Sequence, residues 1–528
     1  MDNHPRRGWN GCPGVKKYGT QINSGGWNLP AASLKEWLTL IALAAGLFVL
    51  IGLADRFRSA LHWDPEFTRK FVHVATGVLI FFTPYLFVSP VPLIVLALFF
   101  MAVNFAGLRL NLFKGMHGTK RPTFGTVYYP LSFLLLVLLF WQNHKVIVQL
   151  AMLILALADA AAAIVGENLR SVHTYRISGE SNSFEGSLAM ALTMAAVVVP
   201  GLLFLPHAKV YSISLGLAVA LGFATGLFSA VLESLSWSGS DNLTVPLGAA
   251  FVLHFGLTHP AGQNLAFFLG MALAAVIAAG SYAARFLSGS GAAGTFILGT
   301  FVFGIGRWEW GVPILAFFIS SSLLSKLWRE RKKASSLLYE KSSRRDLGQV
   351  SANGGAAAVA VLLFYVSRSP IWYGVYLGSL AAVTADTWAT EIGSLSRRPR
   401  LITTLRQVIP GTSGGISGIG LLGALLGSLM MGLVGLWMAP ALLRPLARSF
   451  LAVSAAGFLA SLVDSLLGAT LQAQYRCPVC DKQTEKHTHC GEHPTLFIRG
   501  RRWINNDIVN AACAFSGAVL TAAGFWLF

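Results

Sequence analysis

Apolar segments alternate with short polar segments along nearly the whole chain. The apolar segments are roughly 15 to 22 residues long, close to the ~20 residues that a helix needs to cross the hydrocarbon core of a bilayer. We count about fifteen or sixteen of them. Backbone amides in lipid have no partners except one another, so each segment is expected to form a helix. The pattern therefore predicts an all-α fold, that of a polytopic helical integral membrane protein.

Composition supports this prediction and narrows the class of partner. Hydrophobic residues make up 54% of the chain, charged residues only 12%, and the mean hydropathy is +0.61, which excludes a soluble domain of this size. The net charge of +18 lies in the polar segments, where Lys and Arg flank the apolar ones instead of forming one stripe. This distribution argues against a nucleic-acid partner and predicts attraction to membrane lipids and to phosphate groups.

Counting spans assigns the polar segments to the two sides of the membrane. The count places all the polar motifs described below on one face, together with the basic loops, and basic loops mark the cytoplasmic side. We therefore expect sites that face the cytoplasm, at a bacterial inner membrane because no organelle transit signal is present. Residues 1–32 are polar, basic and glycine-rich, and we expect a disordered tail, not a signal peptide. The same count places this basic tail on the non-cytoplasmic face, contrary to the rule that basic segments face the cytoplasm.

One short phrase occurs twice and places a carboxylate near the end of an apolar segment each time. The two copies are Ala158-Asp159-x-x-Ala162-x-x-Val165-Gly166 and Ala385-Asp386-x-x-Ala389-x-x-Ile392-Gly393. An ionisable group inside the membrane costs roughly 2.5–3.5 kcal/mol on insertion scales, so it is a functional-site hypothesis by default. Two copies predict two related sites in two tandem bundles, residues 33–258 and 259–528.

The first half holds further polar motifs around Asp159. Arg69, Lys70 and His73 fall within one helical turn at the start of an apolar segment. Glu185, Gly186 and Ser187 stand at a helix start, where free N–H groups and the helix dipole favour a phosphate. Glu233 is followed by Asp241 and Asn242, which lead another apolar segment. Each motif has a plainer interpretation: headgroup-level basic residues, a structural ion pair, or a helix cap.

Together, these first-half motifs resemble the phytol kinase family, which is related to dolichol kinase, over about residues 60–258. The resemblance implies an enzyme that phosphorylates an isoprenoid alcohol, commonly with CTP as the donor. It also implies that Asp159, Glu185, Glu233, Asp241 and Asn242 handle a Mg²⁺–nucleotide complex. Asp159, Glu185 and Glu233 would be catalytic, and Arg69, Lys70 and His73 would lie near the phosphates.

The second half has its own set of polar motifs. The loop Gly411-Thr412-Ser413-Gly414-Gly415 precedes a helix and offers backbone N–H groups and two hydroxyls without bulk, so it can hold phosphates. It lacks the Walker lysine and is not a P-loop, and simple flexible packing is the alternative. Carboxylates suited to Mg²⁺ occur nearby in sequence order, with Asn506 adding a neutral oxygen; they are Asp386, Glu391, Asp464 and Asp507. This half resembles the family that contains phytyl-phosphate kinase.

A Cys/His-rich segment, residues 475–505, forms the longest polar insertion of the second half. Cys477, Cys480, His487 and Cys490 have the spacing of zinc ligands, with His489 and His493 close by. A structural Zn²⁺ would stiffen this segment. The alternative is a reduced cytoplasmic loop in which the cysteines merely lie close together.

Spacing extends the similarity between the halves beyond the repeated phrase. Glu185 follows Asp159 by the same number of positions as Thr412 follows Asp386. Glu233 and Asp464 also follow their aspartates at nearly equal separations. Arg69 and His73 have the same spacing as Arg345 and Gln349, and Gly77 and Gly354 follow at nearly equal separations. This ordered series indicates an internal repeat.

The sequence therefore predicts a bifunctional isoprenoid kinase. Its first half would convert a lipid alcohol to the monophosphate with CTP or another NTP, and its second half would convert this lipid monophosphate to the diphosphate. A cytidylyltransferase that makes a CDP-lipid is the alternative enzyme, and a membrane transporter the alternative of another class.

Overall fold

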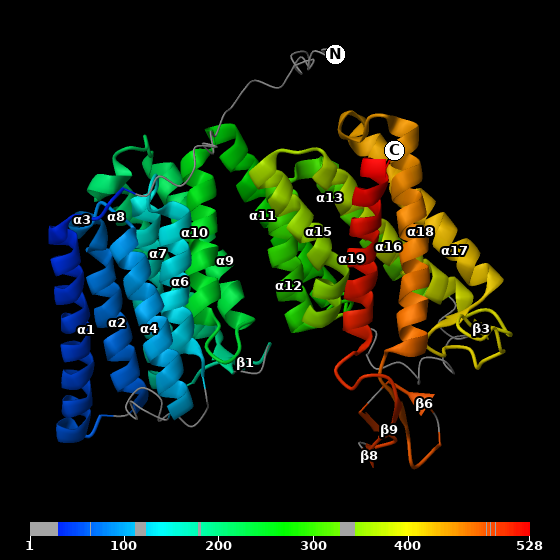
Figure 1. The fold of residues 1–528 in the computed structure, drawn as a ribbon, viewed down its shortest axis with the longest axis horizontal. Coiled ribbons are helices and arrows are strands. Elements are labelled where there is room, and N and C mark those ends of the chain that lie inside the picture. The colour runs from blue at the N-terminus through cyan, green and yellow to red at the C-terminus, as the bar shows by residue number, and fades with distance from the viewer. Residues whose placement is uncertain are drawn as a thin grey trace, which may run out of the picture.

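The structure is a computed structural model that describes residues 30–63, 65–110, 123–169, 171–177, 181–327, 344–481, 483–485, 487–491 and 493–527. The expected tail, residues 1–32, lies almost entirely outside these ranges. Within them the chain forms sixteen α-helices, besides the single-turn helix α3, and they are arranged as two neighbouring groups (Figure 1). The expected all-α architecture is confirmed.

The first group of helices runs from Leu34 to Thr258. A two-stranded antiparallel hairpin, β1 with β2, precedes α8. The elements are α1 (Leu34–Leu61), α2 (Pro65–Phe81), the short α3 (Thr83–Leu86), α4 (Val91–Leu110), α6 (Gly125–Phe140), α7 (Lys145–Asn168), β1 (Thr174–Tyr175), β2 (Asn182–Ser183), α8 (Phe184–Phe204), the 3₁₀ turn η1 (Pro206–Ala208), α9 (Leu215–Ser234) and α10 (Asp241–Thr258).

The second group of helices includes one π-helical stretch, η2, which continues α12. Its helices are α11 (Ala261–Ala283), α12 (Gly289–Gly299), η2 (Thr300–Ile305), α13 (Arg307–Lys326), α15 (Leu347–Ser367), α16 (Ile371–Gly393), α17 (Gly418–Met438), the 3₁₀ turn η3 (Pro440–Leu443), α18 (Leu446–Thr470) and α19 (Asn506–Leu527). A short hairpin, β3 (Arg400–Leu401) with β4 (Gly415–Ile416), precedes α17.

The Cys/His-rich segment folds as short strands between α18 and α19. They form a three-stranded sheet in the order β6-β5-β9 and a separate pair, β7-β8. The strands are β5 (Gln474–Arg476), β6 (Gln483–Thr484), β7 (Thr488–His489), β8 (His493–Pro494) and β9 (Leu496–Arg499).

Ten of the described helices are long and apolar enough to cross a membrane, and two more are shorter apolar helices. Many large hydrophobic side chains on the helices remain exposed, among them Leu139, Leu269, Trp437 and Trp526. Such surface is stable only against lipid or another apolar surface. The chain is an integral membrane protein, as the sequence predicts.

Two large hydrophobic cores hold the described helices together. The first contains buried residues from Leu40 to Phe303, and the second contains residues from Val302 to Ala518. Phe267 and Met271 of α11 belong to the first core. The two cores therefore meet near η2, downstream of the expected border at 258/259.

The short strands mark one end of the helix bundle. The hairpin β1–β2, the hairpin β3–β4 and the β5–β9 segment all lie at the lower end in Figure 1. These elements carry or adjoin most of the polar motifs of both halves, so the expectation that these motifs share one side agrees with the arrangement of the helices.

Candidate functional sites

The repeated phrase lies where pairs of helices approach closely. A Cβ added at Gly186 of α8 would lie 3.0 Å from the carbonyl oxygen of Ala162 on α7, and one at Gly420 of α17 would lie 3.0 Å from that of Ala389 on α16. Both alanines belong to the repeated phrase. The small residues of the phrase therefore allow near backbone contact beside Asp159 and beside Asp386.

Both partner helices begin with a serine cap. The Gly186 N–H donates to Ser183 Oγ at 3.1 Å, and the Gly420 N–H donates to Ser417 Oγ at 3.2 Å. These equivalent contacts align Ser183 with Ser417, whereas spacing aligns Glu185 with Thr412. The Gly186 N–H is held by its own cap, which differs from the expected free phosphate-binding group.

The basic motif of the first half lies beside an apolar pocket. This pocket has a volume of about 110 Å³ and lies between α1, α2, α4 and α6, with Arg69, His73 and Asn242 among its lining residues. The His73 ring meets the Tyr129 ring edge-on, with centroids 4.5 Å apart. Within the described residues, His73 Nε2 and Tyr129 Oη are buried without a hydrogen-bond partner. The pocket thus combines an apolar interior with two polar atoms available to a ligand.

Asp159 belongs to the same neighbourhood. Asp159, Arg69 and Lys70 are the charged groups that act electrostatically on His73. Asn242 donates through Nδ2 to the Gly239 carbonyl at 3.1 Å and lies 3.3 Å from Asp241 Oδ2, at the start of α10. The structure therefore brings the basic motif, Asp159 and the start of α10 toward one pocket.

The remaining first-half acids, Glu185 and Glu233, interact with residues at the β1–β2 hairpin. Glu185 accepts the His173 backbone N–H at 3.0 Å and lies 2.7 Å from His173 Nδ1. The Tyr175 hydroxyl lies 2.6 Å from Ser187 Oγ, and Glu233 acts electrostatically on Tyr175. His173 and Tyr175 were not predicted from the sequence, because they lie in a polar loop without a motif.

The second half contains a larger and more polar pocket of about 260 Å³. Its lining joins motifs that are far apart in the sequence, including most of those predicted. These residues are Asp386, Glu391, Gly411, Thr412, Ser413, Gly414, Gly415, Asp464, Gln472, Glu485, Asn506 and Asn510. Asn506 and Asn510 are one turn apart on α19, so they lie on the face of that helix that lines the pocket. Asp507 lies on a neighbouring face.

Two partly buried carboxyl groups meet in this pocket. Asp386 on α16 and Asp464 on α18 share a side-chain hydrogen bond. Asp464 Oδ2 is buried without a hydrogen-bond partner among the described residues. Two buried carboxylates repel one another unless a proton or a cation lies between them. Carboxylate oxygens with adjacent amide oxygens suit Mg²⁺, so the residues present fit such an ion.

The glycine-rich loop packs directly on α18. Gly411 and Gly414 have φ values of +91° and +78°, in the left-handed region that favours glycine. A Cβ at Gly414 would lie 2.5 Å from the Ala469 Cβ and 2.6 Å from the Ser465 carbonyl oxygen. Glycine at position 414 is therefore required both by conformation and by space.

Side chains from the strand segment complete this pocket. Ser413 Oγ donates to Glu485 Oε1 at 2.5 Å, and Gln472 Nε2 donates to the same oxygen at 2.8 Å. Gln474 Nε2 donates to Ser413 Oγ at 3.0 Å. Glu485 also acts electrostatically on Asp464. Gln472, Gln474 and Glu485 were not predicted from the sequence, since a polar residue in a polar insertion carries no distinguishing pattern.

A second apolar pocket, of about 80 Å³, lies between α11, α12, η2, α13 and α15. Its lining includes Arg345, Gln349 and Gly354, of which Arg345 and Gln349 share the spacing of Arg69 and His73. Burial lowers the pKa of the Arg345 guanidinium, and the negative charge of Glu391 opposes this. Glu391 accepts a hydrogen bond from Ser325 Oγ at 2.6 Å and also lines the polar pocket. Glu391 therefore links the two pockets of the second half.

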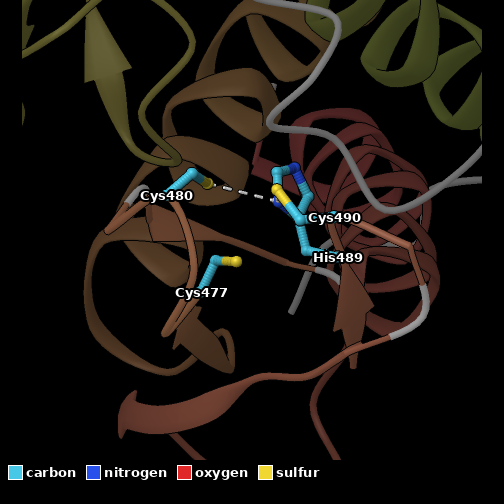
Figure 2. A group of neighbouring side chains, drawn as sticks. All are labelled: Cys477, Cys480, His489 and Cys490. Atoms are coloured by element: carbon cyan, nitrogen blue, oxygen red, sulfur yellow. Dashed lines mark hydrogen bonds between the residues drawn. The ribbon is translucent and has the colours of Figure 1, made fainter.

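The Cys/His cluster contains a different histidine from the one predicted. One side-chain ligand atom each of Cys477, Cys480, His489 and Cys490 lies within 4.8 Å of all the others (Figure 2). The predicted His487 instead packs its ring on Tyr475, with centroids 4.6 Å apart. Burial raises the pKa of the Cys477 thiol, but N–H groups of Cys480 and Val479 outweigh it and lower the pKa to about 6.

The fold and these pockets define a polytopic helical membrane protein with carboxylate-lined and apolar pockets in its helix bundle. The chain belongs to the family described as integral membrane protein DUF92, whose model matches residues 272–518.

Several curated proteins are similar to this chain. It is 33% identical to Protein PGR of Arabidopsis thaliana over 273 residues, which are 47% of this chain and 93% of that relative. It is 30% identical to the phytol kinase of Synechocystis over 231 residues, covering 43% of this chain and 95% of the relative. It is 26% identical to the chloroplastic Protein VTE6 of Arabidopsis thaliana, covering 44% and 64%. No solved structure matches the chain.

Proposed function

We propose that this protein is a bifunctional isoprenoid-alcohol kinase that carries out two successive phosphorylations at two sites. The observation that carries the proposal is the polar pocket in which Asp386, Asp464 and the glycine-rich loop meet. Similarity to a phytol kinase supports the reaction class. Phosphoryl transfer depends mainly on positioning and charge neutralisation, and the residues of this pocket are suited to both.

The first site would phosphorylate the alcohol. Its apolar pocket is suited to an isoprenoid chain, and His73 Nε2 is a buried polar atom suited to hydrogen-bond the terminal hydroxyl. Asp159 and Asp241 would hold Mg²⁺ with the nucleotide, and Arg69 and Lys70 would attract the phosphates. A bound Mg²⁺ would neutralise phosphate charge.

The second site would phosphorylate the lipid monophosphate. The apolar pocket beside α15 would take the chain, and the Arg345 guanidinium would face its phosphate. Residues Gly411 to Gly415 would bind the nucleotide phosphates, and Asp386 and Asp464 would hold Mg²⁺ with Asn506 close by. Glu391 would position the lipid phosphate relative to the nucleotide, because it interacts electrostatically with Arg345 and also lines the pocket proposed for the nucleotide.

Matching contacts in the two halves support an internal duplication. The pairs Gly186–Ala162 and Gly420–Ala389 have the same close approach, and Ser183 and Ser417 cap the same relative positions. Two related sites within one chain are suited to two chemically similar steps. We place both sites at the cytoplasmic face of a bacterial inner membrane. The lipid monophosphate would stay in the membrane lipid between the two steps.

The test is the fate of labelled nucleotide. Purified protein with Mg²⁺ and a long-chain isoprenoid alcohol is given CTP or ATP labelled at either the α- or the γ-phosphate. Only γ-label is expected in the lipid products, first in a monophosphate and then in a diphosphate. Incorporation of α-label with release of pyrophosphate would show a cytidylyltransferase instead, and the absence of any labelled lipid would contradict both reactions.

A further inference from the structure

The strand segment between α18 and α19 contains two features whose connection is not evident from the sequence. One is the cluster of Cys477, Cys480, His489 and Cys490, and the other is the contact between Glu485 and the glycine-rich loop. We propose that the cluster binds one Zn²⁺, and that this ion holds Glu485 in place against Ser413 in the polar pocket of the second half. The zinc site stands on its own geometry; only its effect on phosphorylation rests on the proposed function.

The cluster has the composition and dimensions of a structural zinc site. Zn–S bonds of about 2.3 Å and Zn–N bonds of about 2.0–2.1 Å in a tetrahedron separate neighbouring ligand atoms by about 3.4–3.8 Å. The four ligand atoms here lie within 4.8 Å of one another, and the Cys490 and Cys480 sulfurs lie 3.1 and 3.4 Å from His489 Nδ1. Three sulfurs and one nitrogen form a closed set that is typical of a structural site and leaves no open position.

The backbone around the ligands is already shaped for a metal. Cys477 and Cys480 follow β5 in a tight turn, where the N–H groups of Val479 and Cys480 point at the Cys477 sulfur. Cys490 and Gly491 have φ values of +49° and +80°, which turn the chain directly after His489. Figure 2 shows the sulfur atoms and the His489 ring pointing toward one another.

The strands of the segment are very short. Its five strands contain two to four residues each, and isolated hairpins of this length are marginal in water. Small units without a sufficient hydrophobic core are commonly stabilised by a metal or by disulfides. A zinc ion bound by both ends of the chain segment 480–489 would close that segment into a loop.

Glu485 lies inside this loop. It is 9% exposed and receives hydrogen bonds from Ser413 and Gln472. The preceding residue, Thr484, pairs with Tyr475 in the β5–β6 ladder. Because Cys480 and His489 bracket Glu485, the position of its carboxylate depends on the position of both ligands. Zinc would thus affect the polar pocket of the second half through Glu485. In this role Glu485 is a positioning residue for Ser413 and the glycine-rich loop.

The first test measures metal content. Full-length protein purified in detergent is analysed by elemental mass spectrometry, and about one zinc per chain is expected. Cys477→Ser and Cys490→Ser are expected to lose at least about 90% of the zinc, because each removes one of only four ligands. Two matched controls, His487→Ala and Cys513→Ser, are expected to keep it. Wild-type protein that neither contains nor takes up zinc, or ligand variants that keep it, would overturn the site.

The second test separates zinc binding from its effect on the pocket. Glu485→Gln is expected to keep its zinc, and like Cys490→Ser it is expected to speed amide hydrogen exchange in residues 411–415. Unchanged exchange in both variants would overturn the positioning role, whether or not the protein is a kinase. Where the second phosphorylation is detected, both variants are expected to raise the nucleotide KM of that step about tenfold, with a smaller change in kcat and an unchanged first step. If neither phosphorylation occurs in wild type, the proposed function fails while both structural measurements still decide the zinc site.

Discussion

The Asp386 carboxyl on α16 shares a hydrogen bond with the Asp464 carboxyl on α18, and both line the polar pocket of the second half. Two helices that are separated by the whole of α17 in the sequence thus place their acids within reach of one ion. A pair of this kind is unfavourable as two free carboxylates, and a divalent cation relieves the repulsion.

Asp386→Asn tests this pair directly. Removing one negative charge weakens Mg²⁺ binding, so conversion of lipid monophosphate to diphosphate is expected to fall at least about 100-fold. Conversion of alcohol to monophosphate is expected to continue, measured as accumulation of the monophosphate. Asp55→Asn, which changes an exposed carboxylate beside Arg58, is the matched control and is expected to leave both steps unchanged.

Asp159→Asn is the reciprocal variant. It removes the acid that acts on His73 in the first site, so it is expected to abolish phosphorylation of the alcohol. The variant is expected to convert supplied monophosphate at the wild-type rate. Loss of both steps in either aspartate variant would show that the chain has one site and not two.

Arg345→Gln tests recognition of the lipid phosphate. A charge-assisted hydrogen bond is worth roughly 1.5–3 kcal/mol, so the KM for the lipid monophosphate is expected to rise by about 10- to 100-fold. The first step should not change, because Arg345 lines a pocket of the second half. Arg368→Gln, at the opposite end of α15, is the matched control. Equal effects of the two variants would contradict the assignment.

Gly414→Ala tests the shape of the glycine-rich loop. Alanine is strained at a φ of +78°, and its Cβ would lie 2.5 Å from the Ala469 Cβ, so we expect a loss of about 1–3 kcal/mol in local stability. Nucleotide binding by the second site, measured by equilibrium titration, is expected to weaken accordingly. Gly418→Ala, where an added Cβ meets nothing within 4 Å, should bind like wild type. Equal affinity in both variants would count against a phosphate-binding role for the loop.

The helical architecture follows from the sequence because each span must bury its own backbone hydrogen bonds, whatever its neighbours do. The sequence motifs also predict that Asp386, Asp464 and the glycine-rich loop belong to one site, because each motif contains residues that contribute little to a helix packed in lipid. In the first half, the proximity of Asp159 to the basic motif agrees with the same reasoning, while Glu185 contacts His173 of the hairpin.

Other features are decided by geometry that spacing does not encode. His487 precedes β7 and His489 ends it, and the turn at Cys490 and Gly491 follows His489, which lies with the cysteines. The capping serines are a second case. Ser417 lies further along the chain from Asp386 than Ser183 does from Asp159, because the segment before α17 is longer. Counting from the aspartates therefore misses the equivalence of the caps.

The hairpins beside the two sites lie at the same end of the helix bundle (Figure 1). In the proposed two-step reaction, a lipid monophosphate that leaves the first site would already have its headgroup at the end of the bundle where the second site lies. It would reach that site by lateral diffusion within a single leaflet, without flip-flop of a charged headgroup across the bilayer. A shared chain would shorten this two-dimensional search, so little of the intermediate is expected to exchange with a competing lipid phosphatase.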